Sequence, residues 1–401
     1  MRVLASVLTV LLVSSALVGC GKKEEVKPSA TLPTGQTITV WSHMNDDEVL
    51  AIRTKAEAWG KKTNNTVKVV KDLGKFEVLV TASKSPAGPD ITYGMPHDKL
   101  GQFVSANVAL EIPKGTIDES KYTAASIEAG KYNGKQYALP IAAETYALFY
   151  NKDLVQESEL PKTWDELLTL GKKVGFEYNI NDFYFSYAIL AGNGAYVFKT
   201  TNGKVDSTDV GLGGTGAVKG LAMIKNLVDT GLVKGSVTGD IAKGNFVAKK
   251  TGLLISGPWE ISGDKGFKAL KVNYGTVQLP SIDGKPTPSF MGVQVGIVNP
   301  NTKNKELSLN LTKYLQENAL TDIVKCGRMS VVKDAKSDDP LLKGFADQVK
   351  NAQPMPNVPE MAAIWEPGAN ALKLVTSLKA TPEVAAKGML DSIKKGIEVL
   401  K

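Results

Sequence analysis

Aromatic side chains stand beside carboxylates and amides at three places in this 401-residue chain. Residues 182–187 read Asp-Phe-Tyr-Phe-Ser-Tyr, residues 257–260 read Gly-Pro-Trp-Glu, and Trp365-Glu366 follows a proline-rich segment. The C–H faces of a sugar ring stack on aromatic rings, while its hydroxyls form directed hydrogen bonds with carboxylates and amides. This combination indicates a carbohydrate-binding site.

Aromatic residues also fill protein cores, and the local sequence separates the two roles. Trp59 falls on a helical apolar stripe and Trp164 at the start of a predicted helix, so we assign both to the core. Trp259 and Trp365 are flanked by turns and loops, where binding groups concentrate. We therefore expect Trp259 and Trp365 to contact a ligand.

Residue patterns that would support catalysis are weak. The two histidines, His43 and His97, are far apart and lack the spacing of a zinc site. Residues 211–216 fit GxGxxG, but polar turn residues precede them in place of a buried strand, so we interpret them as a loop before a helix. We expect a binding protein without metal or cofactor, not an enzyme. A glycoside hydrolase with two carboxylates in one cleft and a purely structural surface lipoprotein are the alternatives from other classes.

Composition and charge place the chain among ordinary globular proteins. Hydrophobic residues make up 43% of the sequence and charged residues 22%. The formal net charge is +7, but the lysines are scattered singly among acids, which argues against nucleic-acid binding. Beyond residue 35, about 365 residues remain, enough for two domains.

The expected elements alternate between strands and helices. Short β-rich runs at 38–41, 67–70 and 91–93 predict strands, and apolar residues recur at helical spacing along 49–59. Later expected elements are strands at 252–255 and 293–298 and helices at 307–315 and 382–400. This rhythm predicts an α/β fold built on mainly parallel sheets flanked by helices.

The first residues have the pattern of a bacterial export signal. Arg2 precedes an apolar run over 3–18 that is too short to span a membrane, and the run ends in Leu-Val-Gly-Cys at 17–20. This ending resembles the lipobox, in which the chain is cut before the cysteine and the thiol receives lipid. We expect residues 1–19 to be a signal peptide and Cys20 to be lipidated.

The residues after the expected cleavage point support a tether. Residues 20–35 are charged and polar, with two prolines and no apolar pattern, which is typical of a flexible spacer. No later run of about 18 apolar residues suggests a membrane span. Cys326 is the only other cysteine, so we expect no disulfide framework and interpret Cys326 as a small buried residue.

Several segments also carry a family resemblance. The chain resembles the maltose/maltodextrin-binding proteins of bacterial ABC importers, especially the lipid-anchored Gram-positive type, over about residues 37–370. The matching stretches, in family order, are Thr39-Val-Trp-Ser, Gly88-Pro-Asp-Ile, Tyr132-Asn-Gly-Lys, Leu139-Pro-Ile-Ala-Ala-Glu, Tyr150-Asn-Lys-Asp-Leu, Pro161-Lys-Thr-Trp-Asp-Glu, Gly257-Pro-Trp, Val272-Asn-Tyr-Gly, and Met355-Pro-Asn-Val-Pro-Glu-Met with Trp365.

The resemblance implies a two-lobed periplasmic-binding-protein-like fold with the ligand cleft between the lobes. An N-lobe would comprise 36–145 and 295–340, and a C-lobe 146–294 and 341–401, with crossings near Glu144, Phe290 to Val295 and Asp339. The implied partners are a malto-oligosaccharide and the permease subunits of an ABC transporter. The resemblance also implies that the protein is a monomer on the extracytoplasmic face of the cell membrane and that only its lipid anchor holds it there.

The resemblance also carries over individual residues. Carboxylates that would bind sugar hydroxyls match at Glu144 and Asp98, and stacking rings match at Tyr184, Trp259 and Trp365. Asp182 stands where the family has a glutamate with the same role, and Lys99 replaces an arginine beside Asp98. Glu366, beside Trp365, is a further candidate ligand-binding residue. Around Asn45 to Glu48 the chain departs from the family, because it offers Asp46 and Asp47 as candidates but no lysine.

Two departures from the family bear on ligand choice. Gly94-Met-Pro96 stands where the family has a tryptophan in the first lobe, and Ala369 stands where the well-known maltose binder has an arginine. Losing one aromatic platform removes about 1 kcal/mol of stacking. The hypothesis is that maltose binds weakly and longer linear or cyclic dextrins bind better; a binder of another oligosaccharide is the alternative.

The tether gives a direct prediction. We expect the acyl chains on Cys20 to hold the protein at the membrane. Replacing Cys20 with Ala removes this only expected lipid attachment point. We expect the Cys20→Ala protein to be shed into the medium with sugar affinity unchanged, measured by fractionation and titration. A loss of sugar affinity would contradict this assignment.

Overall fold

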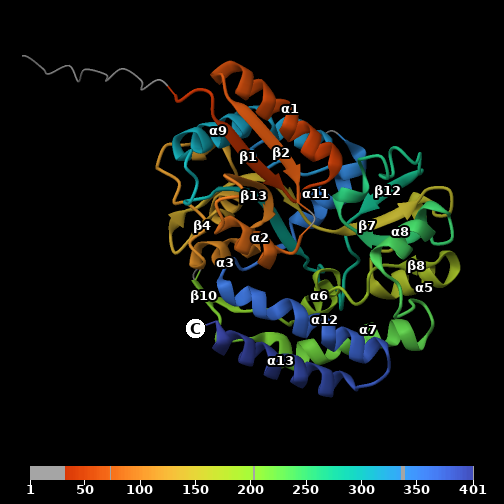
Figure 1. Ribbon diagram of the computed structural model, residues 1–401. Coiled ribbons are helices and arrows are strands. Elements are labelled where there is room, and N and C mark those ends of the chain that lie inside the picture. Colours follow the sequence, from red (N-terminus) through yellow and green to blue (C-terminus); the bar gives the residue numbers. More distant parts are fainter. Residues whose placement is uncertain (1–31, 73, 202–203, 336–338, 401) are drawn as a thin grey trace, which may run out of the picture. The chain divides into compact units, whose positions relative to one another are not determined.

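A computed structural model describes residues 32–72, 74–201, 204–335 and 339–400 (Figure 1). The predicted signal peptide, Cys20 and most of the predicted spacer lie outside these residues. Residues Pro33–Lys401 form one compact unit.

The first of the two larger sheets has six strands. They follow the order β14-β13-β3-β1-β2, and β6 pairs with β13 outside this path. The strands are β1 (Thr37–Ser42), β2 (Thr66–Lys71), β3 (Ile91–Pro96), β6 (Ala138–Glu144), β13 (Phe290–Val298) and β14 (Gln353–Pro354). β1 lies parallel to β2 and β3, as the alternating pattern predicts, and β13 lies parallel to β14 but antiparallel to β3 and β6. Three of the five pairings are therefore parallel.

Helix α1 (Asp46–Thr63) shows how the sequence builds the first lobe. Asn45 and Glu48 form a capping box that satisfies backbone N–H groups at the start of the helix. The apolar stripe predicted for this helix is buried, and its members are Val49, Ile52, Ala56 and Trp59. The core assignments of Trp59 and Trp164 are confirmed, because both side chains are buried.

The second sheet differs from the expected parallel arrangement. Its order is β12-β7-β11-β8, with β7 (Ala147–Asn151), β8 (Phe176–Glu177), β11 (Leu253–Ser256) and β12 (Tyr274–Val277). Only the pairing of β11 with β8 is parallel, while β7 runs antiparallel to both β11 and β12. The prediction of a mainly parallel second sheet was wrong. β7 enters this sheet directly from β6 of the other lobe, so its direction is not set by a β-α-β unit within the sheet.

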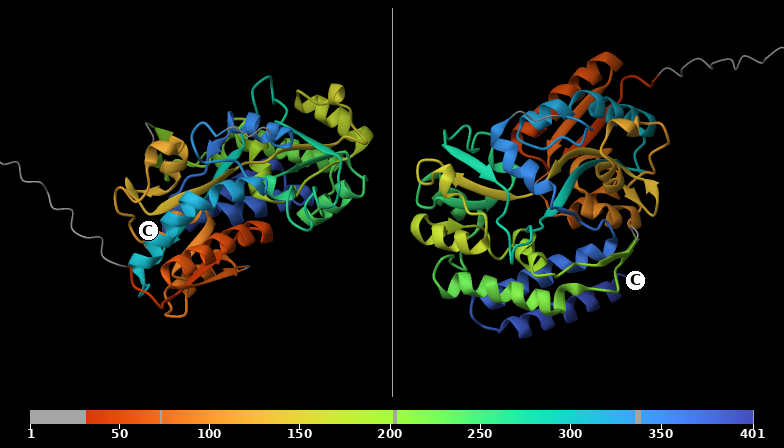
Figure 2. Two further views of the ribbon diagram at one scale, coloured as in Figure 1. Left: turned by 90° about the horizontal axis from the view of Figure 1, so that it is seen from above. Right: turned by 180° about the vertical axis from the view of Figure 1, so that it is seen from behind.

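Helices cover both sheets. They are α2 (Phe76–Ser83), α3 (Leu100–Ser105), α4 (Ala124–Ala129), α5 (Trp164–Val174), α6 (Phe183–Gly192), α7 (Thr215–Asp229), α8 (Gly239–Val247), α9 (Lys305–Asn318), α10 (Leu320–Lys325), α11 (Lys343–Val349), α12 (Ala362–Thr376) and α13 (Pro382–Val399). Figures 1 and 2 show α7, α12 and α13 side by side, and all three pack on one another. Two hairpins, β4–β5 (Lys131–Tyr132 and Lys135–Gln136) and β9–β10 (Lys199–Thr201 and Lys204–Asp206), stand apart from the large sheets.

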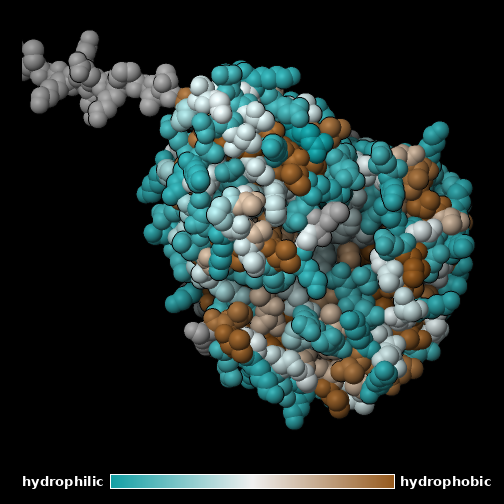
Figure 3. Space-filling view, viewed as in Figure 1, coloured by the Kyte–Doolittle hydropathy of each residue, from teal (hydrophilic) through white to brown (hydrophobic). Residues whose placement is uncertain are grey.

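The exposed surface is mixed in character. Figure 3 shows a mainly hydrophilic face with apolar residues in scattered groups. Over the described ranges, none of the helices combines the length and apolar character that a membrane span requires.

Three segments that are far apart in the sequence, at Thr145, Ser289–Phe290 and Gln353, are connected by buried polar contacts. β6 leads into β7 through Thr145, whose Oγ1 donates to the carbonyl of Phe290 (2.7 Å), and Phe290 begins β13. The backbone N–H of Gln353, in β14, donates to the carbonyl of Ser289 (2.7 Å). The three segments therefore lie side by side where the chain passes between the lobes.

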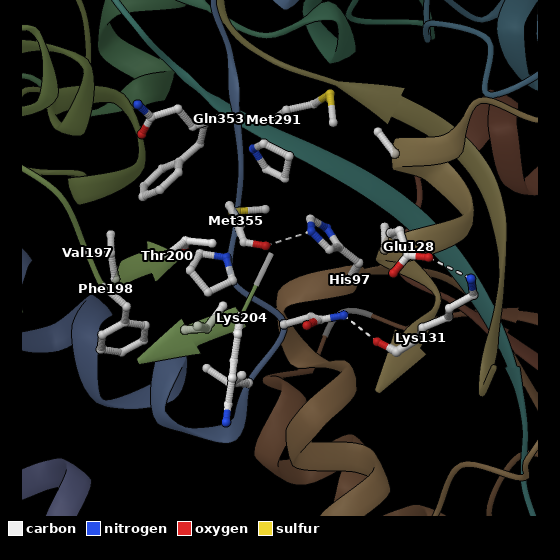
Figure 4. A pocket seen from close by; sticks show the side chains of 18 of the residues that line it. His97, Glu128, Lys131, Val197, Phe198, Thr200, Lys204, Met291, Gln353 and Met355 are labelled. Atoms are coloured by element: carbon white, nitrogen blue, oxygen red, sulfur yellow. Dashed lines mark hydrogen bonds and ion pairs between the residues drawn. The ribbon is translucent and has the colours of Figure 1, made fainter. Parts of the chain in front are cut away.

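His97 connects the same region to the first lobe. Its Nδ1 accepts from the backbone N–H of Val293 (3.1 Å), so Nε2 carries the proton and donates to the carbonyl of Met355 (2.9 Å; Figure 4). Burial lowers the pKa of His97, and the nearby Asp98 carboxylate opposes that effect only in part. The buried ring is therefore neutral and spans three segments.

This arrangement predicts acid sensitivity. Above pH ~6.5 both folded and unfolded states hold a neutral imidazole; below it, the unfolded state takes up a proton first. Stability contributed by His97 should therefore fall as pH drops from ~6.5 toward the lowered pKa. We expect His97→Gln to lower the free energy of unfolding by about 1–3 kcal/mol at pH 7, because the Val293 N–H loses its acceptor, and to flatten the pH dependence.

The measurement is chemical unfolding at a series of pH values between 5 and 7.5. His43 is the only other histidine and is partly exposed, so His43→Gln is the matched control and should keep the wild-type slope. A wild-type slope in His97→Gln would contradict the assignment.

Candidate ligand-binding site

An aromatic cluster lies at the start of α6. Asp182 caps this helix by accepting the backbone N–H of Tyr184 (3.0 Å), which fixes the Tyr184 position. The Tyr184 ring packs against Tyr146 (4.9 Å between centroids) and Phe290 (6.1 Å), and Trp259 lies 6.2 Å away. The predicted residues Asp182, Tyr184 and Trp259 are thus brought together from distant parts of the chain.

Trp259 sits in a 3₁₀ turn, η5 (Pro258–Glu260), that follows β11. Pro258 occupies the first position of this turn, where its missing N–H costs nothing. The indole ring folds back over Gly257, and an added Cβ at Gly257 would overlap it. A glycine at this position is therefore what allows Trp259 to adopt its orientation.

Trp365 faces the first lobe. It lies in the first turn of α12, and its ring contacts Phe183 (6.3 Å) and Phe290 (5.9 Å). The Lys99 Nζ lies 5.0 Å from the Trp365 ring and 2.9 Å from Asp98 Oδ2. Asp98 and Lys99 from one lobe therefore meet Trp365 from the other.

Three buried polar atoms in this region form no hydrogen bond within the described residues: Asp98 Oδ2, the Tyr184 hydroxyl and Trp365 Nε1. Asp98 Oδ2 is ion-paired with Lys99 Nζ (2.9 Å). Burial raises the pKa of Tyr184 well above its ordinary value, and the charges of Tyr146, Asp182 and Asp98 add to the shift in that order. Unsatisfied buried polar groups cost about 1–3 kcal/mol each, so a ligand that bonds to them would recover that energy.

Glu144 lies in a buried charged group that sequence reasoning missed. Arg328 donates to Glu144 Oε2 through Nη1 and to Glu48 Oε1 through Nε (2.5 Å), and Gln294 donates to Glu144 Oε1 (2.9 Å). Both Glu144 oxygens therefore already accept a hydrogen bond within the protein. Glu48 could have been found from sequence, because it stands four residues before the buried Ile52 on the same helical face.

The remaining predicted residues are placed unevenly. Asp46 is exposed and pairs with Lys71 (2.8 Å), so it points away from the other candidates. Asp47 is half-buried, and burial raises its pKa, followed by the neighbouring Glu48 charge. Glu366 is exposed on α12 beside Trp365. Asp182 is half-buried with a pKa raised by burial.

Two cavities border the aromatic cluster. One of about 310 Å³ is lined by Asp182, Tyr184, Trp259 and Glu260, and one of about 640 Å³ by Asp182, Trp365, Glu366 and Ala369. Each of the two cavities is therefore lined by at least one predicted stacking ring and one predicted carboxylate.

A larger cavity than these two lies elsewhere. It measures about 970 Å³, is lined by residues that include His97, Lys204 and Gln353, and contains none of the predicted ligand-binding residues (Figure 4). Its Glu128 is exposed and already paired with Lys131 (2.6 Å). Volume alone does not recognise a sugar, so we place the candidate site at the cluster around Tyr184, Trp259 and Trp365.

Across the described residues, no group of three or more His, Cys, Asp or Glu side chains is arranged to hold a metal ion. Cys326 is half-buried, not fully buried as predicted, and burial raises the pKa of its thiol to about 12.

Comparison with known proteins identifies the family. Residues 45–320 match the model of the bacterial extracellular solute-binding proteins. The chain belongs to this family. This solute-binding protein is 32% identical to the galactooligosaccharide-binding protein of Bacillus subtilis, over 96% of this chain and 95% of that protein. It is 30% identical to a maltooligosaccharide ABC transporter solute-binding lipoprotein of Streptococcus pneumoniae, over 97% and 96% of the two chains.

A solved structure gives the same result. The maltose-maltodextrin binding protein of Alicyclobacillus acidocaldarius is 32% identical and superposes with a TM-score of 0.85, covering 90% of this solute-binding protein and 100% of that chain. The predicted α/β class and the two-lobed fold with an interlobe cleft are confirmed. The relatives are binding proteins, not enzymes.

The position of Trp259 can be tested through its glycine neighbour. We expect Gly257→Ala to displace the indole ring while the protein stays folded, because the three atoms nearest to the added methyl group all belong to that ring and the Gly257 backbone is extended. Near-ultraviolet circular dichroism should change while the far-ultraviolet spectrum does not. Gly239→Ala is the control, since an added Cβ there meets nothing within 4 Å. An unchanged near-ultraviolet spectrum in Gly257→Ala would contradict the contact.

Proposed function

We propose that this protein binds malto-oligosaccharides in the cleft between its lobes and delivers them to the permease subunits of an ABC importer. The observation that carries the proposal is the set of buried atoms on Asp98, Tyr184 and Trp365 that form no hydrogen bond within the described residues and lie beside aromatic faces. A sugar supplies hydroxyls that can bond to these buried atoms and apolar C–H faces that can stack on the aromatic rings. The described contacts of the site contain no nucleophile–base pair of the kind that covalent catalysis uses.

Ligand-binding roles follow from these positions. We assign stacking to Trp259, Trp365 and Tyr184 and hydroxyl binding to Asp98, Lys99 and Asp182, with Asp47 and Glu366 at the edges. Glu144 keeps spare lone pairs beside its internal bonds, so a further sugar hydroxyl remains compatible with it. Asp46 is the weakest candidate, because its carboxylate is exposed and paired with Lys71.

The same proposal covers domain organisation and location. The lobes would comprise 36–145 with 295–340, and 146–294 with 341–401, and would close on the ligand by hinge motion. Family membership and the lipoprotein relative support an extracytoplasmic site of action. We propose that a lipid on Cys20 anchors the protein as a monomer at the membrane.

A galacto-oligosaccharide is the second candidate ligand. A relative of that name is 32% identical over 96% of this chain, and Gly94 and Ala369 depart from the maltodextrin pattern. Glucose and galactose units differ in the orientation of one hydroxyl, so a fixed carboxylate such as Asp98 could discriminate between them.

Calorimetric titration separates the two candidates. We expect maltotriose and maltotetraose to bind more tightly than maltose, and a galacto-oligosaccharide of equal length to bind at least tenfold more weakly. Asp98→Asn should weaken maltotriose binding about tenfold, because a charge-assisted hydrogen bond contributes about 1.5–3 kcal/mol. Asp46→Asn is the matched control and should bind like wild type.

Two results would count against the proposal. Tighter binding of the galacto-oligosaccharide would reassign the ligand to the second candidate. Release of shorter products from maltohexaose would favour the hydrolase alternative.

A further inference from the structure

Arg328 is the buried cation of the first lobe that faces the second. Its side chain is 6% exposed, against 1% for Glu48 and 9% for Glu144. Its Nε lies 2.5 Å from Glu48 Oε1 and its Nη2 3.2 Å from Glu48 Oε2, while Nη1 contacts Glu144 Oε2. One guanidinium therefore serves two buried carboxylates.

The residue type is specific to this geometry. Arg328 is one of three arginines among 48 basic residues, in a chain that uses lysine almost everywhere else. A planar guanidinium can bond to two carboxylates along its edge and still offer its flat face to an aromatic ring, which an ammonium group cannot do.

That face meets Trp259 from the other lobe. The Arg328 Cζ lies 5.9 Å from the Trp259 ring, within the range of a cation–π contact. Asn45 Nδ2 donates to the Trp259 carbonyl (3.3 Å), and an added Cβ at Gly327 would lie 3.1 Å from the Pro258 carbonyl oxygen. The η5 turn is thus docked on a first-lobe surface formed by Asn45, Gly327 and Arg328.

The position of Glu144 links this contact to the crossing segments. Glu144 is the last residue of β6, directly before Thr145, where the chain passes into the second lobe. When the lobes separate, Arg328 would lose Trp259 but keep both carboxylates, so neither lobe arrangement leaves a buried charge unpaired. The Trp259 contact is therefore the part of the Arg328 environment that depends on closure.

We propose that Arg328 is a positioning residue that stabilises the closed arrangement by receiving the Trp259 turn. The inference rests on the proposed function only in that the lobes close around a ligand. It does not depend on which sugar is bound. On this proposal Arg328 determines the lifetime of the closed state, whereas the residues around Tyr184 determine which ligand is bound.

The test uses Arg328→Lys, which keeps a positive charge beside Glu48 and Glu144 but removes the flat face. We expect maltotriose to dissociate about tenfold faster with little change in association rate, measured by stopped-flow tryptophan fluorescence. Small-angle X-ray scattering of the ligand-free protein should give a larger radius of gyration than wild type. Arg53→Lys is the matched control, because Arg53 donates to the Val69 carbonyl within the first lobe.

A double-mutant cycle with Trp259→Leu separates docking from general damage. In the Trp259→Leu background, Arg328→Lys should no longer change the radius of gyration. A full effect in that background, or an unchanged radius of gyration in Arg328→Lys itself, would overturn the proposal. If Arg328→Lys fails to fold, Trp259→Leu alone removes the contact and should enlarge the radius of gyration of the ligand-free protein; an unchanged radius of gyration would overturn the proposal.

The two proposals fail in distinguishable ways. Absence of maltotriose binding in wild type would reject the proposed ligand, while the scattering of ligand-free variants would still decide the role of Arg328. Normal maltotriose binding with identical dissociation rates in wild type and Arg328→Lys would reject the role of Arg328 and leave the ligand assignment standing.

Discussion

The structure depends on satisfying backbone polar groups where the chain passes between the lobes. Three segments run together there, and buried backbone N–H and C=O groups must find partners inside the protein. Thr145 bonds to the Phe290 carbonyl and the Ser289 hydroxyl, and Gln348 bonds to Ser289 as well. These side-chain hydrogen bonds hold the segments side by side between the two sheets.

Part of the candidate site is built on these segments. The Phe290 ring, at the start of β13, packs near both Tyr184 and Trp365. Asp98 follows His97, which is hydrogen-bonded to Val293 and Met355. The proposed closure of the lobes would therefore bring Asp98 and the aromatic rings together around a ligand.

Much of the local structure was predictable from sequence. Alternating β-rich runs and the stripe through Ile52, Ala56 and Trp59 defined β1, α1 and β2, because period and capping are local properties. The antiparallel placement of β7 was not predictable from the sequence, since it depends on pairing with strands that follow about a hundred residues later. Local sequence does not encode which distant strand becomes a neighbour.

The same limit applies to the site. Trp259, Trp365 and Tyr184 were visible as aromatic residues in loops or beside acids, and the structure brings them to one region. Arg328 was not visible, because its partners Glu48 and Glu144 lie 280 and 184 residues away. Its rarity in a lysine-rich chain was the one available signal.

The properties of Cys326 have a practical consequence. Its thiol has a pKa of about 12 and is half-buried, so little of it is thiolate at neutral pH and it reacts slowly with alkylating reagents. A form of the chain without Cys20 would therefore accept a single dye at a cysteine placed on the rim of the cleft, with little labelling elsewhere. Such a conjugate would convert lobe movement into an optical signal, and the protein into a reagentless sensor for its ligand.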